Sequence, residues 1–215
     1  MTTANYIENV ADRNIGSIIS SFAGQGVSPD FFYLTGYEGI FVEADRSQVC
    51  ECVISSVVSL NSDLLLVVNS SSFDTWSELC DGLGINVTLV DAEHVSPSSI
   101  QAILDDNHDI SHIMSLGVKD RGVLVALGAL ARANRRSFVV EVEGADNIRL
   151  ADLEVMNIDY LVQTSDSAAD MSLVIARRSK LVQTEGNARR PNQDIYAMWQ
   201  STVAVRSSSL KPMYL

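Results

Sequence analysis

The 215-residue sequence lacks the features that would place a protein on nucleic acid or in a membrane. Its net charge of −12 is spread along the chain, and no basic stripe offers contacts to phosphates. No window approaches the roughly 20 apolar residues that a membrane span needs, and the N-terminus carries no segment of signal-peptide type. We therefore expect a cytoplasmic protein with neither nucleic acid nor membrane as its partner.

Cysteine is scarce, and the familiar catalytic signatures are missing. The three cysteines, Cys50, Cys52 and Cys80, cannot all pair with one another, so we expect reduced thiols. The three histidines have no metal-ligand spacing, and His112 lies inside a strand pattern, which favours a core or edge residue over a base. Neither a Gly-x-Ser-x-Gly nor a Gly-x-x-x-x-Gly-Lys loop occurs. The sequence predicts no metal site.

What is present is the composition of one globular domain. Apolar residues make up 47% of the chain and charged residues 20%, which is ordinary for a packed core. The length suits one α/β domain over 1–215 better than two. We place its core at about 31–178, and interpret 179–215 as a C-terminal helical extension.

Apolar runs of strand length alternate with amphipathic stretches of helix length. Strands are predicted at 31–34, 64–68, 85–90, 110–116, 138–142, 160–162 and 173–176. Helices are predicted at 6–22, over Val49, Val53 and Val57, at 73–83, 98–104 and 124–133, and around Ile195, Trp199 and Val203. Crossover helices between strands imply a mostly parallel sheet covered on both faces, which is a three-layer α/β sandwich.

Several segments together resemble the large domain of class V aminotransferases, which are pyridoxal phosphate (PLP) dependent transferases of fold type I. The run Asn157 to Val162, followed by Leu173 to Leu181, resembles the region around their cofactor lysine. Downstream, Gly186 to Arg189 and Asp194 to Trp199 resemble their Gly-Asn-Ala-Arg and Asp-Leu-Tyr stretches. The likeness is nearest to the 2-aminoethylphosphonate:pyruvate aminotransferases and spans roughly residues 31 to 199.

The resemblance implies a PLP site whose lysine is missing. Where the family has Ser-Ala-Asn-Lys, this chain has Thr164-Ser165-Asp166-Ser167, so Ser167 stands at the lysine position and offers no amine for a Schiff base. The Gly-Pro-Gly turn that follows in the family is also absent. We expect no catalytic residue and no bound PLP.

The implied phosphate and ring contacts have changed as well. We align the family's Gly-Ser-Gly-Thr turn, between a strand and a helix, with Gly36-Tyr37-Glu38-Gly39. There Glu38 would repel a phosphate, although a plainer interpretation is an acid in the first turn of a helix. Glu141 keeps a carboxylate where the family has the Asp that contacts the pyridine nitrogen. Lys119 lies near the former site, in a run more typical of a solvated charged loop.

Two further implications concern the assembly and its extent. Family members are dimers with sites at the subunit interface, and they have a C-terminal small domain that we do not find before Leu215. We therefore favour a non-catalytic, PLP-independent pseudoenzyme that acts through protein contacts, as a homodimer or with a related aminotransferase.

The alternatives are a repurposed or residual enzyme. One is a transferase of the 2-aminoethylphosphonate aminotransferase type that uses a lysine from another subunit. The other is a PLP-free enzyme of small molecules that uses acids and a lysine in the vacated pocket, which are Glu38, Glu141, Glu143, Asp166 and Lys119.

Overall fold

The computed structural model describes residues 36–143, 148, 150–164 and 171–201. Within these residues, seven strands form one sheet in the order β1-β7-β6-β5-β4-β2-β3. The strands are β1 Tyr37–Glu43, β2 Asp63–Val68, β3 Val87–Asp91, β4 Ile110–Leu116, β5 Ser137–Glu143, β6 Tyr160–Thr164 and β7 Met171–Arg177. Strands β2 to β6 run parallel, whereas β7 is antiparallel to both of its neighbours, β6 and β1. The predicted mostly parallel sheet is confirmed.

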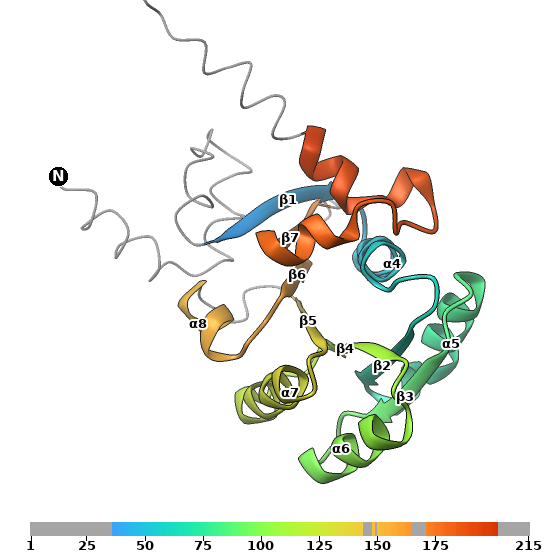
Figure 1. Cartoon of the computed structure of the whole chain (residues 1–215), viewed down its shortest axis with the longest axis vertical. Helices are drawn as coiled ribbons and strands as arrows, with labels where there is room; N and C mark the ends of the chain where they lie inside the picture. The colour runs from blue at the N-terminus through green and yellow to red at the C-terminus, as the bar shows by residue number, and fades with distance from the viewer. Residues whose placement is uncertain (1–35, 144–147, 149, 165–170, 202–215) are drawn as a thin grey trace, which may run out of the picture.

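Helices cover both faces of this sheet (Figure 1). One face carries α4 Arg46–Val57, α5 Phe73–Gly82, α9 Arg178–Leu181 and a helix over residues 195–201. The other face carries α6 Pro97–Asp106, α7 Arg121–Ala133 and α8 Leu150–Val155. Each face has its own apolar cluster, so the molecule has three layers, as the alternating pattern predicts. The sequence pattern did not predict α8.

Local capping explains where the helices begin. The Asp45 side chain accepts from the backbone N–H of Gln48, whose side chain accepts from the Asp45 backbone N–H, so α4 starts with a capping box. Ser96 and Ser99 form the same arrangement before α6, with Pro97 in its first turn. Asp120 accepts from two backbone N–H groups of α7. Each cap satisfies donors that a helix otherwise leaves unpaired.

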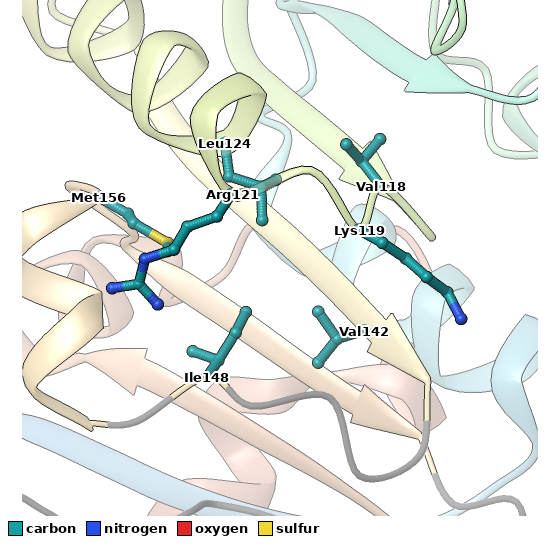
Figure 2. Close-up of a pocket in the computed structure, with 7 residues that line it drawn as sticks. All are labelled: Val118, Lys119, Arg121, Leu124, Val142, Ile148 and Met156. Carbon is teal, nitrogen blue, oxygen red and sulfur yellow. The ribbon is translucent and has the colours of Figure 1, made fainter.

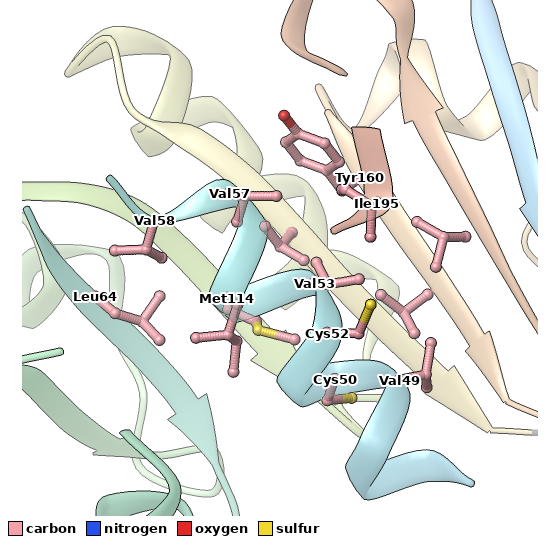
Figure 3. Close-up of a cluster of buried hydrophobic side chains, with 14 of the residues drawn as sticks. Val49, Cys50, Cys52, Val53, Val57, Val58, Leu64, Met114, Tyr160 and Ile195 are labelled. Atoms are coloured by element: carbon pink, nitrogen blue, oxygen red, sulfur yellow. The ribbon is translucent and has the colours of Figure 1, made fainter. Parts of the chain in front are cut away.

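The cluster beneath α4 shows how the predicted helix face is used (Figure 3). Val49, Val53 and Val57 are buried on the sheet side of α4. They belong to the same cluster as Met114 of β4 and Tyr160 of β6. Burial of each such side chain is worth about 1.5–3 kcal/mol, so this face holds α4 against the sheet.

The segment Gly36 to Gly39 is not the strand-to-helix turn that the sequence suggested. Tyr37, Glu38 and Gly39 are the first residues of β1, paired with Arg177, Ala176 and Ile175 of β7. The strand-to-helix turn comes later, at Ala44 and Asp45. Both proposed roles of Glu38, beside a phosphate and in the first turn of a helix, are therefore wrong.

Some of the predicted helices and strands lie outside the described residues. These are the opening helix at 6–22, the strand at 31–34 and the end of the last amphipathic stretch at Val203. Ile195 and Trp199, by contrast, are buried in the cluster around α4. The division into one domain with a C-terminal extension stays a prediction. Among the described residues, no helix has the length and apolar character to cross a bilayer.

Candidate functional site

The carboxyl ends of the strands bring the candidate site together. Glu141 and Glu143 lie at the end of β5, while Gly117 and Lys119 follow the end of β4. Arg46, in the first turn of α4, arrives from the end of β1. In open α/β sheets this edge is the usual place for ligands, because loops and helix N-termini converge there.

The carboxylate of Glu141 is fully buried and accepts four hydrogen bonds. Oε1 accepts from Nε of Arg46 at 2.8 Å and from the Thr164 hydroxyl at 3.2 Å. Oε2 accepts from Nη2 of Arg46 at 2.9 Å and from the backbone N–H of Gly117 at 2.9 Å. A carboxylate offers about four acceptor positions, so these donors use all of them.

Arg46, the ion-pair partner of this buried acid, lies partly at the surface. Its side chain is 42% exposed, whereas that of Glu141 is 0% exposed. The hydrogen bond to Glu141 raises the pKa of Arg46, against a smaller opposing effect of burial. Nη1 of Arg46 lies 3.9 Å from a carboxylate oxygen of Glu143, which is half-exposed. The bidentate contact is the strong form of an arginine–carboxylate pair.

Glycine at position 117 makes room for the guanidinium. Its φ is +67°, and a Cβ there would lie 3.1 Å from Nη2 of Arg46. Any other residue would be strained in this left-handed conformation and would crowd Arg46. The turn after β4 is thus matched to an arginine in α4.

Lys119 is exposed, as its charged neighbours predict. Figure 2 shows Lys119 and Arg121 on one short segment, with their charged ends directed apart. Arg121 makes two hydrogen bonds to the buried carboxylate of Asp152 in α8. Between these side chains lies a pocket of about 200 Å³, whose walls include Val142 and Met156. Arg121 thus closes one side of the pocket while it ties α7 to α8.

The structure places the other predicted site residues at the opposite edge of the sheet. Glu38 is buried near the start of β1 and forms an ion pair with Arg178. The Tyr37 hydroxyl donates to the backbone oxygen of Ile158 at 2.9 Å, and the Arg177 guanidinium lies over its ring. Burial raises the pKa of Tyr37. Gly36 and Gly39 belong to this same end of β1.

The predicted group of acids is therefore not assembled as one cluster. Glu38 lies five residues before the end of β1, roughly 17 Å along the strand from the edge that carries Glu141. Glu143 and Lys119 remain near that edge. Asp166 and Ser167 lie outside the described residues. Among the described residues, no group of three or more His, Cys, Asp or Glu side chains could hold a metal ion.

Sequence reasoning missed Arg46, the central cation of this edge. A signal was available, because Asp45 and Gln48 have the spacing of a capping box directly before an amphipathic run. That spacing marks the start of the helix, and hence places the strand-to-helix turn after Val42 and Glu43. Gly36 and Gly39 are the stronger turn signal in the local sequence, although both lie at the start of β1.

Comparisons with known proteins agree on the fold. A phosphoserine aminotransferase from Cytophaga hutchinsonii matches with a TM-score of 0.63 at 13% identity, over 93% of this chain and 54% of that one. A ureidoglycine–glyoxylate aminotransferase from Bacillus subtilis matches with a TM-score of 0.57 at 16% identity, over 78% and 45% of the two chains. The fold is that of the PLP-dependent transferases of fold type I.

Sequence comparison finds relatives among the 2-aminoethylphosphonate transaminases. The chain is 24% identical over 176 residues to a 2-aminoethylphosphonate–pyruvate transaminase from Bacteroides fragilis, which covers 77% of this chain and 49% of the relative. It is equally similar to a bifunctional phosphonoacetaldehyde hydrolase/aminoethylphosphonate transaminase from Clostridioides difficile, over 28% of that protein. No family profile matches the chain. The resemblance to class V aminotransferases, and among them to 2-aminoethylphosphonate–pyruvate transaminases, is confirmed.

The chain spans about half the length of the curated transaminases that it matches, and less of the bifunctional protein. Whether a small domain accompanies it stays a prediction.

Proposed function

We propose that this chain is a non-catalytic, aminotransferase-like protein that does not bind PLP and acts through protein contacts. The observation that carries the proposal is the state of Glu141, the acid that the resemblance places beside the pyridine nitrogen. All of its acceptor positions are engaged by Arg46, Gly117 and Thr164. A protonated ring nitrogen would have to displace one of these donors.

Charge supports the same conclusion. Arg46 neutralises the buried carboxylate, so the acid has little attraction left for a second cation. Moving Arg46 away would leave Glu141 buried without its ion-pair partner, at a cost of about 3–5 kcal/mol. The residues around Glu141 thus do not fit the cofactor that the fold implies.

The lysines of the chain give no alternative attachment at the expected place. The sequence has three, at positions 119, 180 and 211, and none at position 167. Lys180 lies on α9, which follows β7, and Lys119 is exposed after β4. An aldimine at the family's position therefore has no amine in this chain.

The test is to incubate the purified protein with PLP, reduce it with borohydride and measure its intact mass. We expect no stoichiometric pyridoxyl adduct, whereas the Bacteroides fragilis transaminase, treated in parallel, should acquire one. A complete adduct on a single lysine, located by peptide mapping, would refute the proposal. Faint modification spread over several lysines is the background for exposed amines and agrees with it.

The protein-contact part of the proposal rests on the resemblance to dimeric enzymes. Light scattering during gel filtration should give the mass of a homodimer, or of a heteromer after mixing with an intact relative. A monomer that also fails to join such a relative would overturn this part. The location in the cytoplasm belongs to the same proposal, and fluorescence microscopy of a tagged chain tests it.

A second candidate is an enzyme that uses the vacated edge of the sheet without PLP. It is favoured by one observation, the presence of Lys119 and Glu143 around the same cavity as Arg46. Glu141, however, is committed to its four donors, which removes the buried acid from such a group. A screen for turnover of small amines and oxo acids, with and without PLP, distinguishes this candidate from the first.

A further inference from the structure

The chain changes direction across the sheet between β2 and β4. From β2 it continues to β3 on one side, and from β4 it continues to β5 on the other side. The helices that follow, α5 and α7, lie on opposite faces of the sheet (Figure 1). Such a topological switch point opens a crevice at the carboxyl ends of the two strands, where α/β proteins commonly bind ligands.

A cavity of about 210 Å³ occupies this crevice. Asn69 and Ser72 line it after β2, Lys119 lines it after β4, and Arg46 enters from α4. Trp76, which is buried, forms part of its wall. All of these residues are among those that the structure describes, and they come from three separate segments of the chain.

Several hydrogen-bond donors on the lining have no protein partner in the part of the chain that the structure describes. Within the described residues, the Lys119 ammonium makes no hydrogen bond or ion pair, and Ser72 does not cap α5 with its side chain. The Asn69 amide oxygen accepts from the backbone N–H and the hydroxyl of Ser71, so its remaining polar group is the NH₂ donor. Nη1 of Arg46 has Glu143 at 3.9 Å, which is beyond a hydrogen bond.

Acceptors on the lining are fewer. Among the described lining residues Glu143 is the one carboxylate, and its side chain is 53% exposed. The neighbouring Glu141 already has its four donors. The described lining therefore suits a ligand that accepts hydrogen bonds and carries negative charge.

We propose that this crevice binds a small oxyanion, a carboxylate or a phosphate-type group, with Lys119 as its principal charged partner. Arg46 and the Asn69 amide supply further donors, and the Trp76 wall suits the uncharged part of such a molecule. Glu143 competes with the ligand for Arg46 and limits the affinity. The inference goes beyond the proposed function and does not depend on it, because a chain that cannot hold PLP can still bind a small anion.

The test is calorimetric titration of the full chain with inorganic phosphate and, separately, with acetate. Ionic strength is held constant because simple screening would otherwise change with each addition. We expect saturable binding of at least one anion at one site per chain, and the two titrations identify the preferred head group. Fluorescence of Trp76, measured in a Trp199→Phe background, should change with the same midpoint.

Matched variants locate the site. Lys119→Gln should weaken binding on the order of three- to tenfold, and Glu143→Gln should strengthen it by a similar factor. Arg135→Gln, which removes a positive charge from the exposed turn before β5 at the other edge, should leave the affinity unchanged. Circular dichroism checks that the exposed substitutions keep the fold.

Two results would overturn the proposal. One is the absence of saturable binding of either anion. The other is an equal loss of affinity in Lys119→Gln and Arg135→Gln, which would indicate a general effect of net charge. The borohydride test with PLP keeps the two proposals apart, because a complete pyridoxyl adduct on a single lysine would refute the proposed function, whereas the phosphate and acetate titrations report on the anion site alone.

Discussion

The guanidinium of Arg46 donates two hydrogen bonds to the carboxylate of Glu141, from Nε to Oε1 at 2.8 Å and from Nη2 to Oε2 at 2.9 Å. The two residues are 95 positions apart in the sequence. One partner is half-exposed and the other fully buried. A single arginine thus solvates an acid that the fold would otherwise leave charged in the core.

Removing this arginine should destabilise the protein. Arg46→Met keeps the length of the apolar stem but leaves Glu141 buried without its partner, so we expect a loss of about 3 kcal/mol in the free energy of unfolding. Urea denaturation followed by circular dichroism measures it. Arg190→Met is the control, because Arg190 pairs with Glu51 near the surface and should cost less than about 1 kcal/mol.

The double variant Arg46→Met with Glu141→Met separates lost charge compensation from lost packing. We expect it to recover to within about 1 kcal/mol of the wild type, since no charge is left buried. The Gly117 N–H and the Thr164 hydroxyl keep backbone acceptors at 3.3 and 3.4 Å. A double variant as unstable as Arg46→Met would contradict this account.

Gly117 should be more sensitive to substitution than an otherwise similar glycine. Gly117→Ala incurs the left-handed backbone cost of about 1–2 kcal/mol and also crowds Nη2 of Arg46 at 3.1 Å. Gly186, with φ of +75° and no atom within 4 Å of a built Cβ, incurs the backbone cost alone. The midpoint temperature of thermal unfolding should therefore be lower for Gly117→Ala than for Gly186→Ala. Equal losses in the two variants would show that the Arg46 side chain moves aside at no cost.

Gly128 permits a close approach between α7 and the turn that follows α8. A Cβ at this position would lie 1.8 Å from the backbone oxygen of Met156, which cannot move as a side chain could. Gly128→Ala should lower stability by more than about 3 kcal/mol, despite the better helix propensity of alanine.

The matched helix glycine is Gly82, whose built Cβ meets nothing within 4 Å. Gly82→Ala should raise stability by about 0.5–1 kcal/mol. Denaturant midpoints of the two variants test the contrast, and a tolerated Gly128→Ala would mean that α7 can shift away from Met156.

His112 should make the protein less stable in mild acid. Burial lowers the pKa of His112 to about 3, and the charge of Lys180 acts in the same direction. The unfolded chain, with an ordinary histidine pKa near 6.5, then binds the proton more readily than the folded chain. The stability is fully present above about pH 6.5 and falls as the pH drops toward 3, by up to about 1.4 kcal/mol per unit.

Urea midpoints at pH 7.5, 6 and 5 measure this slope. His112→Leu should flatten it, while His108→Leu, at an exposed position, should leave it as in the wild type. A wild-type slope that persists in His112→Leu would assign the effect to other groups.

Local patterns predicted most of the strands and helices, because the apolar periodicity that marks each element is carried by consecutive residues. The apolar runs at 64–68 and 110–116 became β2 and β4, and the three valines of α4 lie on its buried face, as expected. β1 was missed because its buried acid, Glu38, breaks the apolar alternation. Its partner Arg178 lies 140 residues away, beyond any local window.

The sequence by itself determined the layered α/β fold, the family resemblance and the serine at position 167, since composition, periodicity and residue identity are local properties. Only the tertiary structure decided which acid meets which cation. That choice depends on the path of the chain over the sheet. β7 and β6 lie between β1 and β5, and it is α4, which follows the turn at Ala44 and Asp45, that brings its first residue, Arg46, to Glu141 at the end of β5. Hydrogen bonds are short and directional, so a buried carboxylate pairs with whichever donor the fold places within about 3 Å of it.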